Sequence, residues 1–308
     1  MEAVERLQPP QPPIVIAHRG ASGHRPEHTL AAYELAIELD TDFIEPDLVI
    51  TRDGVLIARH ENEISETTDV SARPEFATRR TTRQIDGVEI TGWFTEDFTL
   101  AEIRTLRARE RLPFRDHSWD GRFGIPTFEE VLDLAVRRGV GVYPETKHPS
   151  YFRGIGLPLE ERLLAALEAR GWTDRDAPVF IQSFETGNLR ELRKQTGVRL
   201  IQLLEAEGHA PPTPEDLAWI ATYADGIGPN KRLIVPAGQD GRLLPPTSLV
   251  EDAHRAGLAV HPWTFRSDPQ FLAREYDGRP EREIEQFFAL GVDGVFSDFP
   301  EVAVRVRP

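Results

Sequence analysis

Short apolar runs alternate along the chain with stretches whose apolar residues recur at helical spacing. The runs lie at residues 14–18, 43–50, 141–147, 179–184, 199–204, 225–229, 258–265 and 294–298. Runs of this length, rich in β-branched residues and separated by helices, are typical of parallel strands. Eight of them, mostly followed by a helical pattern, predict an α/β fold of the TIM (β/α)8-barrel type. We expect a single barrel domain over residues 1–308.

The helical stretches carry their own start and stop signals. Thr99 and Thr127 are each followed three residues later by a glutamate, the capping-box spacing in which both ends satisfy free backbone donors. The apolar patterns at 131–139, 163–171 and 249–257 each close on a glycine, as helix C-termini prefer. These signals predict helices between the strands.

One long segment interrupts this alternation. Residues of about 61–125 contain only one clear helical pattern and are rich in threonine, arginine and aromatic residues. A connection of this length in a compact domain is usually a functional lid or an inserted subdomain. We therefore predict an insertion after the second barrel strand. Residues 1–13 are expected to form an extended N-terminal arm.

Composition narrows the classes of partner. Fifty-one acidic residues against 36 lysines and arginines give a formal charge of −15, which disfavours nucleic acid as a partner. The absence of cysteine excludes disulfides, thiolate metal sites and a cysteine nucleophile. No apolar run approaches the roughly 18 residues of a membrane span. Without a recognisable leader, the default expectation is a cytoplasmic location, or a periplasmic or secreted one if a leader has been removed.

Polar residues gather where the predicted strands end. In barrels of this type, catalytic groups lie at the C-terminal ends of the strands. Seven candidates fall at or near such ends: His18, Arg19, Glu45, Asp47, His60, Glu145 and Lys147.

Glu45 and Asp47 are two residues apart on one strand, so both side chains face the same way. With Glu145 from the next strand, they form a three-carboxylate oxygen site that suits Mg²⁺ or Ca²⁺. The alternative, which an isolated E-x-D pattern favours, is a helix cap or an ion pair with an arginine.

The other candidates also have two interpretations. His18 and His60 are suited to acid–base work because imidazole titrates near neutrality, but a lone histidine is more often structural. Arg19 and Lys147 could bind phosphate or simply pair with acids. Phe184 and Trp263 could line a substrate pocket or belong to the core.

Several motifs together resemble the glycerophosphodiester phosphodiesterase family. They are HRG at 18–20, PEHT at 26–29, FIEPDLVITRDG at 43–54, ARHENEI at 58–64, YPETK at 143–147, QSF at 182–184 and GVDGVFSDFP at 291–300. They occur in the family's order over nearly the whole predicted barrel. The segment 61–125 is similar to the long-insertion branch typified by periplasmic enzymes.

The resemblance implies metal-dependent hydrolysis of glycerophosphodiesters to an alcohol and sn-glycerol 3-phosphate. It makes His18 and His60 the acid–base pair, with either water or the substrate's own 2-hydroxyl as the attacking group. One divalent cation, Ca²⁺ or Mg²⁺, would be bound by the matching carboxylates, Glu45, Asp47 and Glu145. Phosphate would be bound by the matching basic residues, Arg19 and Lys147, while Glu27 would support the loop beside His18.

Two alternatives use the same fold. One is phospholipase D-like hydrolysis of lysophospholipid or sphingomyelin head groups, and the other is a non-catalytic glycerol-phosphate binding protein. The chain also departs from the family pattern at two positions. His28 stands where asparagine is usual, and Glu61 stands where aspartate usually follows the second histidine.

Overall fold

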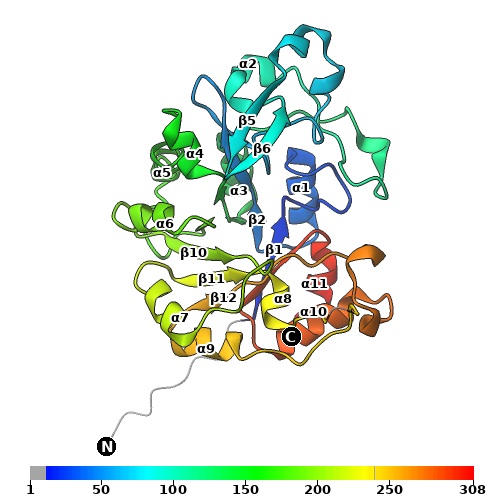
Figure 1. Ribbon diagram of the computed structural model, residues 1–308, viewed down its shortest axis with the longest axis vertical. Helices are drawn as coiled ribbons and strands as arrows, with labels where there is room; N and C mark the ends of the chain where they lie inside the picture. The colour runs from blue at the N-terminus through cyan, green and yellow to red at the C-terminus, as the bar shows by residue number, and fades with distance from the viewer. Residues whose placement is uncertain (1–11, 239) are drawn as a thin grey trace, which may run out of the picture.

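The computed structural model describes residues 12–238 and 240–308, so most of the predicted N-terminal arm lies outside the described residues. This part of the chain forms a barrel with eight parallel strand positions, two of which are each divided into two short strands (Figure 1). The strands are β1 (Ile14–His18), β2 (Phe43–Glu45), β3 (Asp47–Ile50), β7 (Gly141–Val142), β8 (Glu145–Thr146), β9 (Phe180–Ser183), β10 (Arg199–Leu204), β11 (Gly226–Pro229), β12 (Ala259–Val260) and β13 (Gly294–Ser297). This confirms the predicted (β/α)8 fold.

Two of the predicted strands are each divided by a proline. The run 43–50 forms β2 and β3 on either side of Pro46, and the run 141–147 forms β7 and β8 around Pro144. Proline has no N–H to donate to a neighbouring strand, so the regular ladder stops there. The carbonyl of Pro46 still accepts a hydrogen bond from the Glu145 N–H at 3.0 Å, so the two interrupted strands stay joined at this point.

The barrel closes between its last and first strands. β1 pairs in parallel with both β13 and β2. On the other side of β13, Phe265 forms a parallel bridge with Ser297, and the Asp293 N–H donates to the Val260 carbonyl at 2.9 Å. The seventh predicted strand, 258–265, is regular only over β12, and its remainder reaches β13 through such single bridges.

Helices cover the outside of the barrel. They are α1 (Leu30–Glu38), α3 (Phe128–Arg138), α4 (Pro149–Gly154), α5 (Glu160–Glu168), α6 (Thr186–Arg193), α7 (Pro214–Ile220), α8 (Lys231–Ile234), α9 (Leu249–Arg255), α10 (Pro280–Ala289) and α11 (Pro300–Val306). Thr127 caps α3 through the predicted capping box, and Gly139 ends that helix with a left-handed φ of 68°.

The apolar core has two layers. A large cluster fills the space between the strands and the helices. A smaller cluster fills the inside of the barrel, where the Tyr143 ring stacks on Phe180 with centroids 4.9 Å apart and meets Phe296 edge-on. The barrel interior is therefore closed by aromatic side chains beneath its mouth.

Residues 61–125 leave the barrel after the short strand β4 (Leu56–Ala58), which runs antiparallel to β3. They contain α2 (Leu100–Ile103) and the hairpin of β5 (Thr81–Ile85) and β6 (Val88–Gly92), gathered at one end of the molecule (Figure 1). Buried residues of this segment, such as Val70 and Phe98, belong to the same cluster as the barrel's outer core. The predicted capping box at Thr99 begins α2.

Within the described residues, no helix is long and apolar enough to cross a membrane.

The aromatic interior predicts the effect of two substitutions at Tyr143. Its hydroxyl lies 2.8 Å from Nδ1 of the buried His261. Tyr143→Phe should lower the free energy of unfolding by about 1–3 kcal/mol because it leaves that nitrogen without a partner. Tyr143→Ala should cost about 3–5 kcal/mol because it also leaves a cavity. Urea unfolding measures both, with the exposed Val136→Ala as control; equal losses for the two variants would contradict a stabilising role of the ring.

Candidate active site

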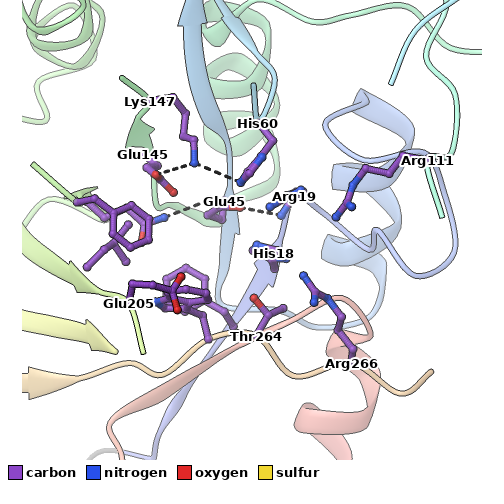
Figure 2. Close-up of a pocket in the computed structure, with 15 residues that line it drawn as sticks. His18, Arg19, Glu45, His60, Arg111, Glu145, Lys147, Glu205, Thr264 and Arg266 are labelled. Atoms are coloured by element: carbon purple, nitrogen blue, oxygen red, sulfur yellow. Dashed lines mark hydrogen bonds and ion pairs between the residues drawn. The ribbon is translucent and has the colours of Figure 1, made fainter. Parts of the chain in front are cut away.

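The C-terminal ends of the strands surround a pocket of about 360 Å³. Figure 2 shows the residues that line it, which come from several different strand ends. Eight of the predicted site residues are among them: His18, Arg19, Glu45, His60, Glu145, Lys147, Phe184 and Trp263. The other two, Asp47 and Glu27, are buried behind the pocket wall. The structure thus brings all the sequence-predicted residues together.

Three carboxylates converge at the base of this pocket. Glu45, Asp47 and Glu145 each offer an oxygen within 4.8 Å of the other two, and all three side chains are buried. Register places them together, since Asp47 is directly opposite Glu145 in the β3–β8 pair. The predicted oxygen cluster is present in this arrangement.

Burial and mutual repulsion act on these carboxylates. Burial, followed by the charges of Asp47 and Glu145, raises the pKa of Glu45 well above its usual range. Burial and the charge of Asp47 also raise the pKa of Glu145, although Lys147 opposes this. Asp47 is different: burial raises its pKa, but the hydrogen bond from His28 and the charge of Lys147 outweigh it and lower the pKa. A divalent cation would offset the repulsion, so the donor set fits a hard ion with oxygen ligands.

His28 supports this cluster from behind. It has a left-handed φ of 56° and is fully buried. Its Nε2 lies 2.9 Å from Asp47 Oδ2, and its Nδ1 lies 2.8 Å from the Tyr33 hydroxyl. Asparagine and histidine both tolerate left-handed backbone better than most residues. Histidine at position 28 therefore fits this left-handed backbone and supplies a polar contact to the predicted metal ligand.

Arg19 lies in the loop after β1, where its φ is 61°. Its backbone N–H donates to Glu45 Oε2 at 2.8 Å, and its guanidinium lies 3.0 Å from Glu27 and 3.4 Å from Asp47. Glu27 also pairs with Arg111 from the segment 61–125, at 3.0 Å. Glu27 therefore fixes two arginines that line the pocket, in keeping with its predicted supporting position.

His18 is held by a carboxylate that the sequence analysis did not assign. Its Nδ1 lies 2.7 Å from Asp298 Oδ1, at the end of β13. The second oxygen of Asp298 accepts from Arg115 at 2.6 Å and from Arg266 at 3.1 Å. Burial, and then the charge of Arg19, lower the pKa of His18 to about 4 against the opposing effect of Asp298.

His60 is held by a longer chain of polar side chains. Its Nδ1 lies 2.8 Å from Glu61 Oε1, and the other Glu61 oxygen lies 2.9 Å from His148 Nε2. His148 Nδ1 then lies 2.6 Å from Asp86, at the turn of the β5–β6 hairpin. Burial, followed by the charges of Arg19 and Lys147, lowers the pKa of His60 to about 3. Glutamate at position 61 has the reach to contact both histidines.

Lys147 links the acidic cluster to this histidine. Its Nζ lies 3.1 Å from Glu145 Oε1 and 3.2 Å from His60 Nε2, as the dashed lines in Figure 2 show. On the same side of the pocket, the rings of Phe184 and Trp263 meet edge-on with centroids 5.8 Å apart. Phe184 is 41% exposed, so it belongs to the pocket wall and not to the core.

Sequence reasoning missed several polar residues of the site. Asp298 ends the predicted strand 294–298, and Gln182 lies two residues before the end of the predicted strand 179–184, so a position near a strand end could have marked both. Gln182 donates to Glu45 at 3.1 Å. Arg111 comes from the segment 61–125, where no strand end signals a role, whereas Arg266 directly follows the predicted strand 258–265.

Comparison with known proteins gives a consistent result. The glycerophosphoryl diester phosphodiesterase family matches residues 18–302. Glycerophosphodiester phosphodiesterase GDPD6 of Arabidopsis thaliana is 38% identical over 93% of this chain and 84% of its own length. The glycerophosphodiester phosphodiesterase of Bacillus subtilis is 32% identical over 96% of this chain and 86% of its own.

Solved structures show the same fold. A putative glycerophosphoryl diester phosphodiesterase from Silicibacter pomeroyi superposes with a TM-score of 0.70 at 22% identity, covering 96% of this chain and 94% of that one. A phosphodiesterase from Oleispira antarctica, in complex with the product sn-glycerol-3-phosphate, superposes with a TM-score of 0.65 at 24% identity, covering 96% of each chain.

The repulsion among the carboxylates predicts a measurable response to cations. Ca²⁺ or Mg²⁺ at one hundred times its Kd should stabilise the protein by about 2.7 kcal/mol, because only the folded chain assembles the ligands. Thermal unfolding after chelation and re-addition of each ion measures this. Glu145→Gln should abolish the stabilisation, whereas Glu34→Gln, on the exposed face of α1, should retain it. A cation effect that persists in Glu145→Gln would place the ion elsewhere.

Proposed function

Since this chain belongs to the glycerophosphoryl diester phosphodiesterase family and is a phosphoric diester hydrolase, we propose how its own residues carry out the reaction. The substrate is a small glycerophosphodiester, which is split into an alcohol and sn-glycerol 3-phosphate. The observation that carries this proposal is the single pocket in which three buried carboxylates, two imidazoles and several basic side chains meet. The Oleispira antarctica enzyme, whose complex holds sn-glycerol-3-phosphate, supports the same product here.

The carboxylates of Glu45, Asp47 and Glu145 would hold one divalent cation, Ca²⁺ or Mg²⁺. When bound, such a cation supplies Lewis-acid neutralisation of the charge on the phosphoryl oxygens. The rest of the anionic charge is met by residues of the chain, because Arg19, Lys147, Arg111 and Arg266 all line the pocket. Donors fixed before substrate arrives stabilise developing charge without reorganisation, and Glu27 fixes two of these arginines.

His18 and His60 are proposed to move the protons. Each uses Nδ1 to contact a carboxylate, Asp298 or Glu61, which fixes the ring, so the proton would be exchanged at Nε2. In His60 that nitrogen also lies 3.2 Å from Lys147 Nζ. One imidazole removes a proton from the attacking hydroxyl, and the other protonates the leaving alcohol oxygen. Both histidines have a lowered pKa in the pocket without substrate. The negative charge of a bound diester would offset the charge of Arg19 and raise the pKa of each imidazole. The histidine that acts as the acid could then carry its proton.

The direct test is release of glycerol 3-phosphate. Purified protein, treated with chelator and then supplied separately with Ca²⁺ or Mg²⁺, is assayed on glycerophosphocholine, glycerophosphoethanolamine and glycerophosphoglycerol. Release should require the cation, and His18→Ala or His60→Ala should each lower kcat by about 10²- to 10⁴-fold. Glu34→Gln is the matched control. No release from any diester with either ion would refute the proposal.

The contacts of Glu61 lead to a second expectation. Because Glu61 orients His60 without touching the substrate, Glu61→Gln should lower kcat by at least about tenfold and leave KM nearly unchanged. Glu89→Gln, an exposed change on β6 of the same insertion, should alter neither constant. A rise in KM with kcat intact would instead mean that Glu61 contributes to substrate binding.

A further inference from the structure

We propose that a second pocket beside the active site binds a cationic leaving alcohol, so that the enzyme prefers zwitterionic glycerophosphodiesters. This inference rests on the proposed function, because it assigns the alcohol end of the same substrate. The second pocket, here called the head-group pocket, has a volume of about 390 Å³ and is lined by residues that include Phe184, Glu205, His209, Asp216, Trp219 and Tyr223. A cavity of that size accommodates a small organic head group.

The head-group pocket continues from the active-site pocket. Phe184, Leu203 and Glu205 line both. Figure 2 shows Glu205 on the opposite side of the active-site pocket from Arg111 and Arg266. A diester whose phosphate lies among the basic residues can therefore extend past Phe184 and Glu205 without leaving the protein surface.

The two pockets differ in the charge of the side chains that line them. Four basic side chains line the active-site pocket, those of Arg19, Arg111, Lys147 and Arg266, beside the carboxylates of Glu45 and Glu145, whose charge a bound cation would offset. Among the described residues, none that lines the head-group pocket is a lysine or arginine, and Glu205 and Asp216 carry its carboxylates. One end of the combined cleft thus favours an anion and the other a cation, which is the charge layout of a zwitterion.

The Glu205 carboxylate is fixed at the junction of the two pockets. Its Oε1 accepts from Asn230 Nδ2 at 2.9 Å and from the Ala206 N–H at 2.7 Å. These two partners and the Glu207 N–H, at 3.4 Å, are neutral donors, so within the part of the chain that the structure describes no ion pair cancels the negative charge of Glu205. A held charge of this kind attracts a cation more effectively than a freely rotating surface carboxylate.

Aromatic side chains complete the pocket. Trp219 is 50% exposed, although large aromatics are usually more buried, and its ring meets Tyr223 edge-on at 5.2 Å. Tryptophan faces bind ammonium groups through the negative charge of the ring face, and quaternary ammonium ions best match such a surface.

The test compares two substrates that differ only in charge. Glycerophosphocholine carries a trimethylammonium group, and glycerophospho-3,3-dimethylbutanol replaces that nitrogen with carbon at nearly the same shape. The kcat/KM for the choline ester should exceed that for the neutral ester by about tenfold at low salt. The ratio should fall as salt rises, because Glu205 is exposed to solvent.

Substitutions in the head-group pocket test which residues cause the preference for the choline ester. Glu205→Gln and Trp219→Leu should each bring the choline-to-neutral ratio close to one. Glu207→Gln, an exposed change two residues from Glu205 that does not line either pocket, should preserve the wild-type ratio. Because the readout is a ratio within one protein, partial loss of folded enzyme does not affect it.

The outcomes separate this inference from the proposed function. Equal hydrolysis of both esters by the wild-type enzyme would overturn the cation site and leave the phosphodiesterase activity intact. A preference that survives in Glu205→Gln and Trp219→Leu would also overturn it, since the selectivity would then lie elsewhere. Failure to release glycerol 3-phosphate from either ester would instead count against the proposed function.

Discussion

Repulsion among three buried carboxylates is the constraint around which the mouth of this barrel is built. Glu45, Asp47 and Glu145 place oxygens within 4.8 Å of one another, away from water. Four neighbours provide a donor or a positive charge: the Arg19 N–H and Gln182 contact Glu45, His28 contacts Asp47, and Lys147 contacts Glu145. Such a cluster of acids destabilises a fold unless its surroundings oppose it. The surrounding donors reduce the repulsion, and a cation would complete the compensation.

Two prolines interrupt the barrel strands next to this carboxylate cluster. Pro46 and Pro144 stop the regular ladder of two adjacent segments one residue before Asp47 and Glu145. Beneath this level, the aromatic rings of Tyr143, Phe180 and Phe296 close the interior. The carboxylates therefore rest on a packed hydrophobic layer, with the pocket above them. Rigid support below and polar contacts at the sides hold the oxygens in a fixed arrangement.

The two histidines of the site depend on different parts of the chain. His18 is oriented by Asp298 at the end of the last strand, so the closure of the barrel itself fixes the ring. His60 is oriented by Glu61, which His148 and Asp86 hold in turn, so its position depends on the hairpin of residues 81–92. Arg111 and Arg115 also come from the segment after that hairpin and reach Glu27 and Asp298. The segment 61–125 thus contributes directly to the electrostatics of the pocket.

The sequence by itself determined the barrel and most of the site. Apolar periodicity indicated eight strands, and ordered motifs marked nine of the ten site residues that the structure gathers at one mouth; Trp263 was marked by its place near a strand end. Such patterns are local, and strand ends in a closed parallel barrel must meet at one face. Only the tertiary structure decided which distant residues these side chains contact. Asp298 meets His18 across 280 positions, Arg111 reaches Glu27 across 84, and Glu205 faces the arginines across the cleft. These pairings depend on loop paths and barrel closure, which bring together residues distant in sequence and leave no periodic trace in the chain.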